Sequence, residues 1–180
     1  DQHTLLIAGS GHFSDQWAIQ TSSLGLNVIR TAHIEGQQID VAAIEAALRA
    51  DTQHHIAAVM VVQTDTASGI TSDLQAIRKA INSSGHPALY VVDVVASLGA
   101  APFEMDALGA DVCLGSSQKG LMMPPGIGLN ALSPKAIAAS AQARMPKSYW
   151  AWDEMLSMNK TGYFPTTPNT NLLYALSEAC

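Results

Sequence analysis

Residues 88–93 read Ala-Leu-Tyr-Val-Val-Asp, a short apolar run that ends in one acidic residue. The apolar part, 88–92, predicts a strand buried on both faces, as in a parallel sheet covered by helices, and Asp93 follows it. Five more strands are predicted at 4–8, 27–30, 56–62, 111–114 and 126–132. Helices are predicted at 15–23, 40–50, 72–83 and 133–143. This alternation is typical of an α/β protein whose mostly parallel sheet has right-handed crossovers.

Three of the predicted helices are preceded by residues suited to capping a first turn. Asp40 precedes one of them, and Ser72 or Thr71 precedes another. Ser133 precedes the third and is followed by Pro134, which is favoured at the first helical position.

Composition limits the classes of function. The 180 residues are 48% hydrophobic and 13% charged, which fits one domain with a buried core. A net charge of -6 without a basic cluster argues against nucleic acid. No apolar run approaches the roughly 20 residues of a membrane span, and no signal peptide is visible, so a cytoplasmic protein is expected. The six histidines and two cysteines have no metal-ligand spacing.

The two ends of the sequence suggest an excerpt of a longer protein. The chain begins without Met, and it stops within a helical pattern at 171–176. We therefore expect further segments of the protein on both sides of these 180 residues.

Ligands of parallel sheets bind beyond the carboxyl ends of the strands. Four segments lie there, at 9–13, 63–69, 93 and 116–119. The first contains Gly9-Ser10-Gly11, which resembles a dinucleotide loop. The third glycine of that fingerprint is replaced by Ser14, so we reject a nicotinamide cofactor.

Asp93 and Lys119 carry the most specific chemistry in this set. A buried, unpaired carboxylate is costly, so Asp93 either caps a turn or pairs with a buried cation such as a protonated pyridine nitrogen. Lys119 lies between the apolar segments 112–114 and 121–123, among small uncharged neighbours. A lysine amine taken out of water loses its proton more readily and can then form a Schiff base.

Around these two residues the sequence resembles the class V aminotransferases. The matching segments read Asp-Val-Val-Ala-Ser-Leu-Gly-Ala at 93–100, Gly-Ser-Ser-Gln-Lys-Gly at 115–120 and Pro-Pro-Gly at 124–126. The chain is most similar to the alanine–glyoxylate and serine–glyoxylate aminotransferases, and segments 11–17 and 160–168 resemble the serine–glyoxylate branch. Cysteine desulfurases of the same class usually have His where this chain has Gln118.

The resemblance implies a fold and a domain. The fold is the pyridoxal-phosphate (PLP)-dependent transferase fold type I, a three-layer sandwich with helices on both faces of a mostly parallel sheet. Residues 1–180 are then part of the large PLP-binding domain. The small C-terminal domain and an N-terminal segment with the phosphate loop are missing.

The resemblance also implies roles for individual residues. Lys119 forms the Schiff base with PLP and moves a proton between the substrate Cα and the cofactor. Asp93 pairs with the pyridine nitrogen and keeps it protonated, as an electron sink requires. Phe13 stacks on the ring, Thr66 approaches the ring hydroxyl, and Gln118 contacts the phosphate.

The cofactor site is implied to lie at a homodimer interface. Tyr163 and Thr166 of one subunit then reach the phosphate held by its neighbour. The substrates are small amino acids and 2-oxo acids, with serine or alanine as donor and glyoxylate or pyruvate as acceptor. Relatives of this kind can be peroxisomal in eukaryotes.

The chain departs from the family pattern at one stretch, and the arginine that grips the substrate carboxylate is expected in the small C-terminal domain. The chain reads Gln-Thr-Asp at 63–65, where relatives commonly read His-Asn-Glu. None of its four arginines matches the one that grips the substrate carboxylate. Two alternatives therefore stay open. One is another class V enzyme of the lyase or cysteine desulfurase type, which needs a mobile cysteine. The other is a non-catalytic, nucleotide-binding α/β module.

Overall fold

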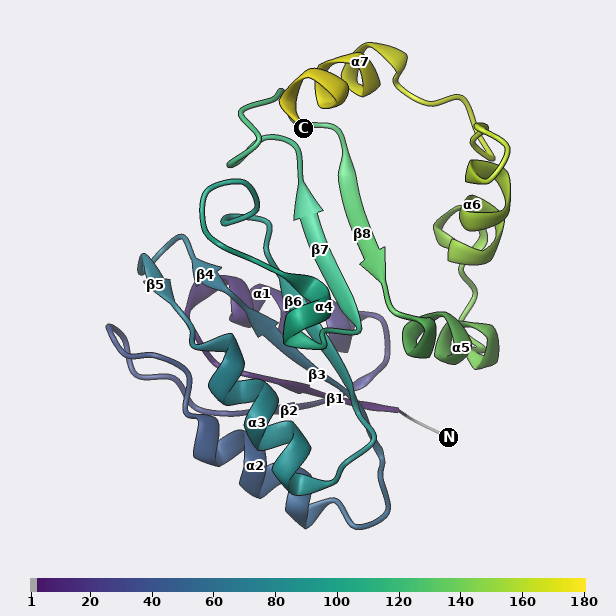
Figure 1. Ribbon diagram of the computed structural model, residues 1–180. Coiled ribbons are helices and arrows are strands. Elements are labelled where there is room, and N and C mark those ends of the chain that lie inside the picture. Colours follow the sequence, from purple (N-terminus) through teal and green to yellow (C-terminus); the bar gives the residue numbers. More distant parts are fainter. Residues whose placement is uncertain (1–2) are drawn as a thin grey trace.

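The computed structural model describes residues 3–180 and is built on a six-stranded sheet in the order β2-β1-β3-β6-β7-β8 (Figure 1). The strands are β1 (Thr4–Ile7), β2 (Asn27–Arg30), β3 (Ile56–Val62), β6 (Leu89–Asp93), β7 (Val112–Ser116) and β8 (Gly128–Leu132). Each lies within two residues of a predicted strand. All pairs are parallel except β7 with β8, so the predicted mostly parallel sheet is confirmed and its antiparallel edge strand is an addition.

The four predicted helices are present. They are α1 (His12–Ser23), α2 (Val41–Ala50), α3 (Leu74–Ser84) and α5 (Pro134–Gln142). The further elements are α4 (Met105–Leu108), η1 (Ser148–Trp150), α6 (Trp152–Asn159), α7 (Thr170–Ala179) and a hairpin of β4 (Thr64–Asp65) with β5 (Ile70–Thr71).

Two of the three predicted caps are confirmed. Asp40 accepts a hydrogen bond from the first turn of α2, and Ser133 accepts one from the first turn of α5. The prediction of Ser72 or Thr71 for α3 is wrong, because Asp73 occupies the cap. Ser72 instead bonds back to β3, donating its backbone N–H to Gln63 and its hydroxyl to Val62.

Helices cover both faces of the sheet, which confirms the predicted three-layer arrangement. The larger core lies under α2 and α3, which pack side by side (Figure 1). In it Ile44, Leu48, Ile77 and Ile81 repeat at helical spacing and are buried against β3 and β6. The smaller core, on the other face, contains Ala18 of α1 with residues of β1 and β3.

The chain after α5 continues through η1, α6 and α7 in an arc beside β8 (Figure 1). None of these three helices contains a buried residue. Within residues 3–180, no helix combines the length and the apolar character that a membrane crossing requires.

Candidate active site

Asp93 lies at the carboxyl end of β6 on the face covered by α1. Side chains alternate along a strand, and Val91 belongs to the smaller core, so Asp93 points to the same side. The carboxylate is 7% exposed. Its Oδ2 accepts a hydrogen bond from Trp17 Nε1 at 2.8 Å, and its Oδ1 accepts one from the Val95 backbone N–H at 2.8 Å.

The electrostatic surroundings of Asp93 favour a cation. Burial raises the pKa of the Asp93 carboxyl; the hydrogen bonds from Trp17 and Val95 oppose this rise, and the nearby charge of Asp65 adds to it. Within residues 3–180, no lysine, arginine or histidine forms an ion pair with Asp93. A buried carboxylate with two donors and no counter-charge fits a positively charged ligand group, such as a protonated pyridine nitrogen.

Ser116 places a buried hydroxyl without a hydrogen-bond partner at this edge of the sheet. It ends β7, and it shares the α1 side with Leu114, two residues earlier. Its hydroxyl is buried, with no hydrogen-bond partner among the described residues. Buried hydroxyls are normally paired, so this one also fits a site that receives a polar ligand.

Asp65 organises the segment that contains Phe13 and Thr66. It is fully buried, and it accepts hydrogen bonds from the backbone N–H of Phe13 at 2.9 Å and of Ala67 at 3.0 Å. The first bond satisfies a free donor at the start of α1, where negative charge is favoured. Asp65 thereby ties the start of α1 to the turn that carries Thr66. Phe13 is 37% exposed, and Thr66 is exposed.

Three backbone N–H groups at the start of α1, where a dinucleotide loop would bind phosphate, are already engaged within the chain. Ser14 Oγ accepts hydrogen bonds from the N–H groups of Ser10 and Gly11, and Asp65 holds that of Phe13. The Asp65 carboxyl also lies 2.9 Å from where a side chain would begin on Gly11. A pyrophosphate would compete with an internal carboxylate here, which supports the rejection of a nicotinamide cofactor.

Lys119 lies in a loop that begins at the end of β7. Ser117, fully buried, closes this loop by donating its hydroxyl to Pro124 O at 2.8 Å and its N–H to Ile127 O at 3.1 Å. Gly120 packs directly on the segment that follows Asp93, because a Cβ on it would lie 2.2 Å from Leu98 O. Both Gln118 and Lys119 are exposed in this chain, so the expected burial of the lysine is absent.

Tyr163 and Thr166 lie apart from the other predicted residues. Both are exposed, in an open pocket lined by residues 162–168 between α6 and α7. Figure 1 shows this segment as the part of the arc that joins α6 to α7, away from α1. One chain therefore brings Phe13, Thr66, Asp93, Gln118 and Lys119 to the same edge of the sheet, and Tyr163 and Thr166 face elsewhere.

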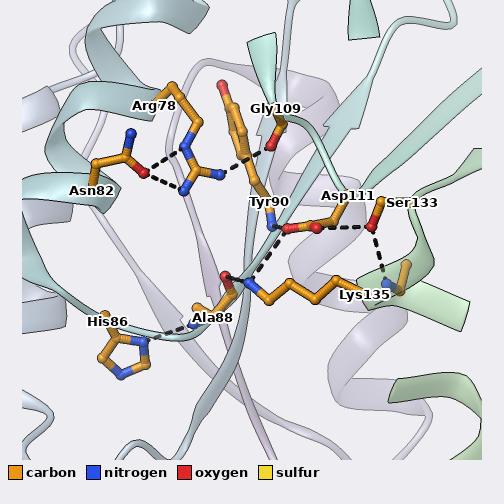
Figure 2. Close-up of polar contacts among 10 residues, drawn as sticks. Arg78, Asn82, His86, Ala88, Tyr90, Gly109, Asp111, Ser133 and Lys135 are labelled. Atoms are coloured by element: carbon orange, nitrogen blue, oxygen red, sulfur yellow. Dashed lines mark hydrogen bonds and ion pairs between the residues drawn. The ribbon is translucent and has the colours of Figure 1, made fainter. Parts of the chain in front are cut away.

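A second polar cluster lies at the opposite edge, where β6 and β7 begin (Figure 2). Asp111 accepts hydrogen bonds from the Tyr90 N–H and the Ser133 hydroxyl. Lys135 Nζ donates to Ala88 O and lies 3.6 Å from Asp111. Every polar group named here has a partner within the chain, so this cluster joins β6, β7 and α5 and is structural.

Sequence reasoning missed four residues of the site: Trp17, Asp65, Ser116 and Ser117. Trp17 and Asp93 are 76 residues apart, so nothing local connects them. Asp65 had a signal, because an acidic residue soon after the buried run 56–62 needs a partner. Ser117 lay within the matched Gly-Ser-Ser-Gln-Lys-Gly segment but could equally have been a surface hydroxyl.

Cys113 supplies no reactive thiol at this edge. Cys113 is 5% exposed within β7, and burial raises its pKa to about 11. A thiol of this kind is a poor nucleophile at neutral pH. Cys180 is exposed and lies directly after the last residue of α7.

A buried acid, an aromatic and a lysine lie at the carboxyl edge of a three-layer α/β sheet, and these are residue types that a PLP-binding site requires. The family model of class-V aminotransferases matches residues 1–180. The chain belongs to the class V aminotransferases, a family that uses PLP.

Known relatives agree with this assignment. The chain is 45% identical to the serine–glyoxylate aminotransferase of Methylorubrum extorquens, over 97% of this chain and 45% of that protein. It is 35% identical to the L-aspartate–glyoxylate aminotransferase of Paracoccus denitrificans, over 98% of this chain and 44% of that protein. The chain thus spans about half the length of the curated relatives it matches.

A solved structure confirms the predicted fold. The alanine–glyoxylate aminotransferase of a Nostoc species superimposes with a TM-score of 0.80 and 29% identity. The match covers 99% of this chain and 47% of that one. The predicted PLP-dependent transferase fold is therefore the fold of this chain.

Proposed function

We propose that this chain forms the cofactor-binding part of a PLP-dependent enzyme that transfers an amino group from serine or alanine to glyoxylate or pyruvate. Residues 1–180 are then part of its large domain. The observation that carries the proposal is Asp93, a buried carboxylate with two hydrogen-bond donors and no cation. Family membership and the orphan hydroxyl of Ser116 support it.

PLP, when bound, supplies an electron sink for the charge that develops at the substrate Cα. Asp93 holds positive charge at the ring nitrogen by Coulomb attraction. At an effective dielectric near 20, a carboxylate about 4 Å away contributes on the order of 4 kcal/mol. That attraction outweighs the nitrogen's tendency to lose its proton near neutrality, since about 1.4 kcal/mol corresponds to one pKa unit.

The other residues of this edge orient the cofactor and handle protons. Phe13, held by Asp65, stacks on the ring and excludes water from one face. Thr66 approaches the ring hydroxyl, and Gln118 contacts the phosphate. Lys119 Nζ holds the cofactor and, once released, takes up the proton that leaves the substrate Cα.

We further propose a homodimer in which Tyr163 and Thr166 complete the neighbour's site. The exposure of both residues, and their distance from the edge that holds Asp93, support this arrangement. The partner subunit would also cover Lys119, whose amine is exposed in one chain. We also propose a cytoplasmic location, or a peroxisomal one if the source organism is a eukaryote.

Glyoxylate is the acceptor named for all three relatives, while the donors are serine, aspartate and alanine. The relatives therefore support glyoxylate as the acceptor more strongly than they support any one amino donor. The test is to supply the intact protein and PLP with each donor and with glyoxylate or pyruvate, and to measure the amino acid formed. Formation of glycine from glyoxylate, with serine or alanine as the amino donor, supports the proposal. Lys119→Ala should abolish this reaction. Sulfide release from cysteine without amino transfer would favour a desulfurase instead.

A further inference from the structure

Trp17 lies one helical turn after Phe13 on α1 and therefore on the same face of the helix. Its ring packs against the smaller core, as do Val91 of β6 and Leu114 of β7. Its indole Nε1 reaches across to Asp93 Oδ2 at 2.8 Å. One helix thus presents both the stacking aromatic and a partner for the carboxylate.

The two hydrogen bonds to Asp93 come from different elements and engage different oxygens. The backbone N–H of Val95, just after β6, donates to Oδ1, and the indole N–H of Trp17 donates to Oδ2. An aspartate bonded at one oxygen can still turn about its Cβ–Cγ bond, whereas two donors fix the plane of the carboxylate. Each oxygen accepts more than one hydrogen bond, so a ligand N–H can still be received.

The chemistry of the indole suits this place. Its N–H only donates, and it keeps its proton throughout the physiological pH range. It therefore withdraws electron density from Asp93 and makes the carboxylate a weaker base. A weaker base leaves the shared proton on the ligand nitrogen, which is where an electron sink needs it.

We propose that Trp17 is a positioning residue that fixes the carboxylate plane of Asp93 and keeps the shared proton on the ring nitrogen of the cofactor. This inference rests on the proposed function, in which Asp93 faces that nitrogen. The competing explanation is that Trp17 only fills space between α1 and the sheet.

Trp17→Phe separates these explanations, because it keeps an aromatic ring and removes the N–H. Trp150→Phe is the matched control, since Trp150 is 79% exposed and lies on η1, away from Asp93. The measurements, made on the intact protein, are the affinity of the cofactor-free form for PLP and the ¹⁵N resonance of ring-labelled PLP in the complex. A urea titration of each cofactor-free variant monitors folding.

We expect Trp17→Phe to bind PLP about tenfold more weakly, which is the usual effect of losing one hydrogen bond to a charged group. We also expect its ring ¹⁵N resonance to move toward that of unprotonated pyridine. Trp150→Phe should change neither quantity. Lower urea stability with unchanged affinity and an unchanged resonance would overturn the proposal and leave Trp17 as packing.

Asp93→Asn distinguishes the failure of this inference from that of the proposed function. If the wild type does not bind PLP, or Asp93→Asn binds it as well as the wild type, both are overturned. If Asp93→Asn loses affinity while Trp17→Phe does not, only the role of Trp17 is overturned.

A measurement on the wild type covers the case in which Trp17→Phe does not fold. The indole N–H resonance of Trp17 is assigned by triple-resonance NMR of the labelled intact protein. We expect this resonance to shift and to exchange more slowly with solvent when PLP is added. No change on cofactor binding would overturn the proposal.

Discussion

Gly120 should be intolerant of even one added methyl group. A Cβ built at this position lies 2.2 Å from Leu98 O and 3.0 Å from Ala100 N. Real Cβ atoms essentially never approach closer than 3.0 Å, so one of the two segments must move by about 0.8 Å. Both contacts are to backbone atoms, which cannot rotate away. Overpacking of this kind costs about 1–3 kcal/mol.

One of these segments carries Lys119 and the other follows Asp93, so Gly120→Ala should damage activity as well as stability. A misplacement of about 1 Å at a reacting group can cost about 100-fold in rate. We expect the free energy of unfolding to fall by about 2 kcal/mol in a urea titration. We also expect serine-to-glyoxylate transfer to fall by about 100-fold.

Gly128→Ala is the matched control for this experiment. Gly128 starts β8, opposite Ser116, and a Cβ there meets nothing within 4 Å. Its stability and activity should remain close to those of the wild type. If Gly120→Ala equals Gly128→Ala in both assays, the packing of the Lys119 loop on residues 98–100 is refuted.

Two other residues give independent predictions. Asp65→Ala leaves the N–H groups of Phe13 and Ala67 without their partner. It should lower the free energy of unfolding by about 2–3 kcal/mol in urea titrations. A loss below about 0.5 kcal/mol would contradict the role of Asp65 as a helix cap. Burial raises the pKa of Asp93 above 3.8 in the folded chain. The folded chain therefore binds this proton more tightly than the unfolded chain does. As the pH rises through the pKa of folded Asp93, the carboxyl ionises and the cofactor-free fold loses stability. Cofactor-free Asp93→Asn should therefore be at least as stable as the wild type at pH 7 while losing affinity for PLP; a clear loss of stability would show that Asp93 is a structural residue.

The sheet could be predicted from the sequence because its strands are continuous apolar runs, such as 56–62 and 89–92. Strand direction could not be read from the same runs. The antiparallel course of β8 had one usable signal, since only residues 117–127 connect it to β7, and they contain no helix. Parallel strands need a crossover of about a dozen or more residues.

The site was predicted less completely, for physical reasons. Asp93 and Lys119 could be placed at one edge because both follow a strand. The hydrogen bond between Trp17 and Asp93 joins positions 76 residues apart, and it forms only when α1 packs on the sheet. The cap on α3 was misplaced by one residue because Ser72 has a competing long-range use, as a donor to β3.

The central claim is that Lys119 holds PLP, and the site of covalent attachment tests it most directly. The intact protein is incubated with PLP and treated with borohydride, which fixes the cofactor to the lysine that holds it, and the label is located by peptide mass spectrometry. The account predicts label on Lys119 alone, and none on the Lys119→Ala variant. A label on any other lysine, or a protein that takes up no label, would contradict it.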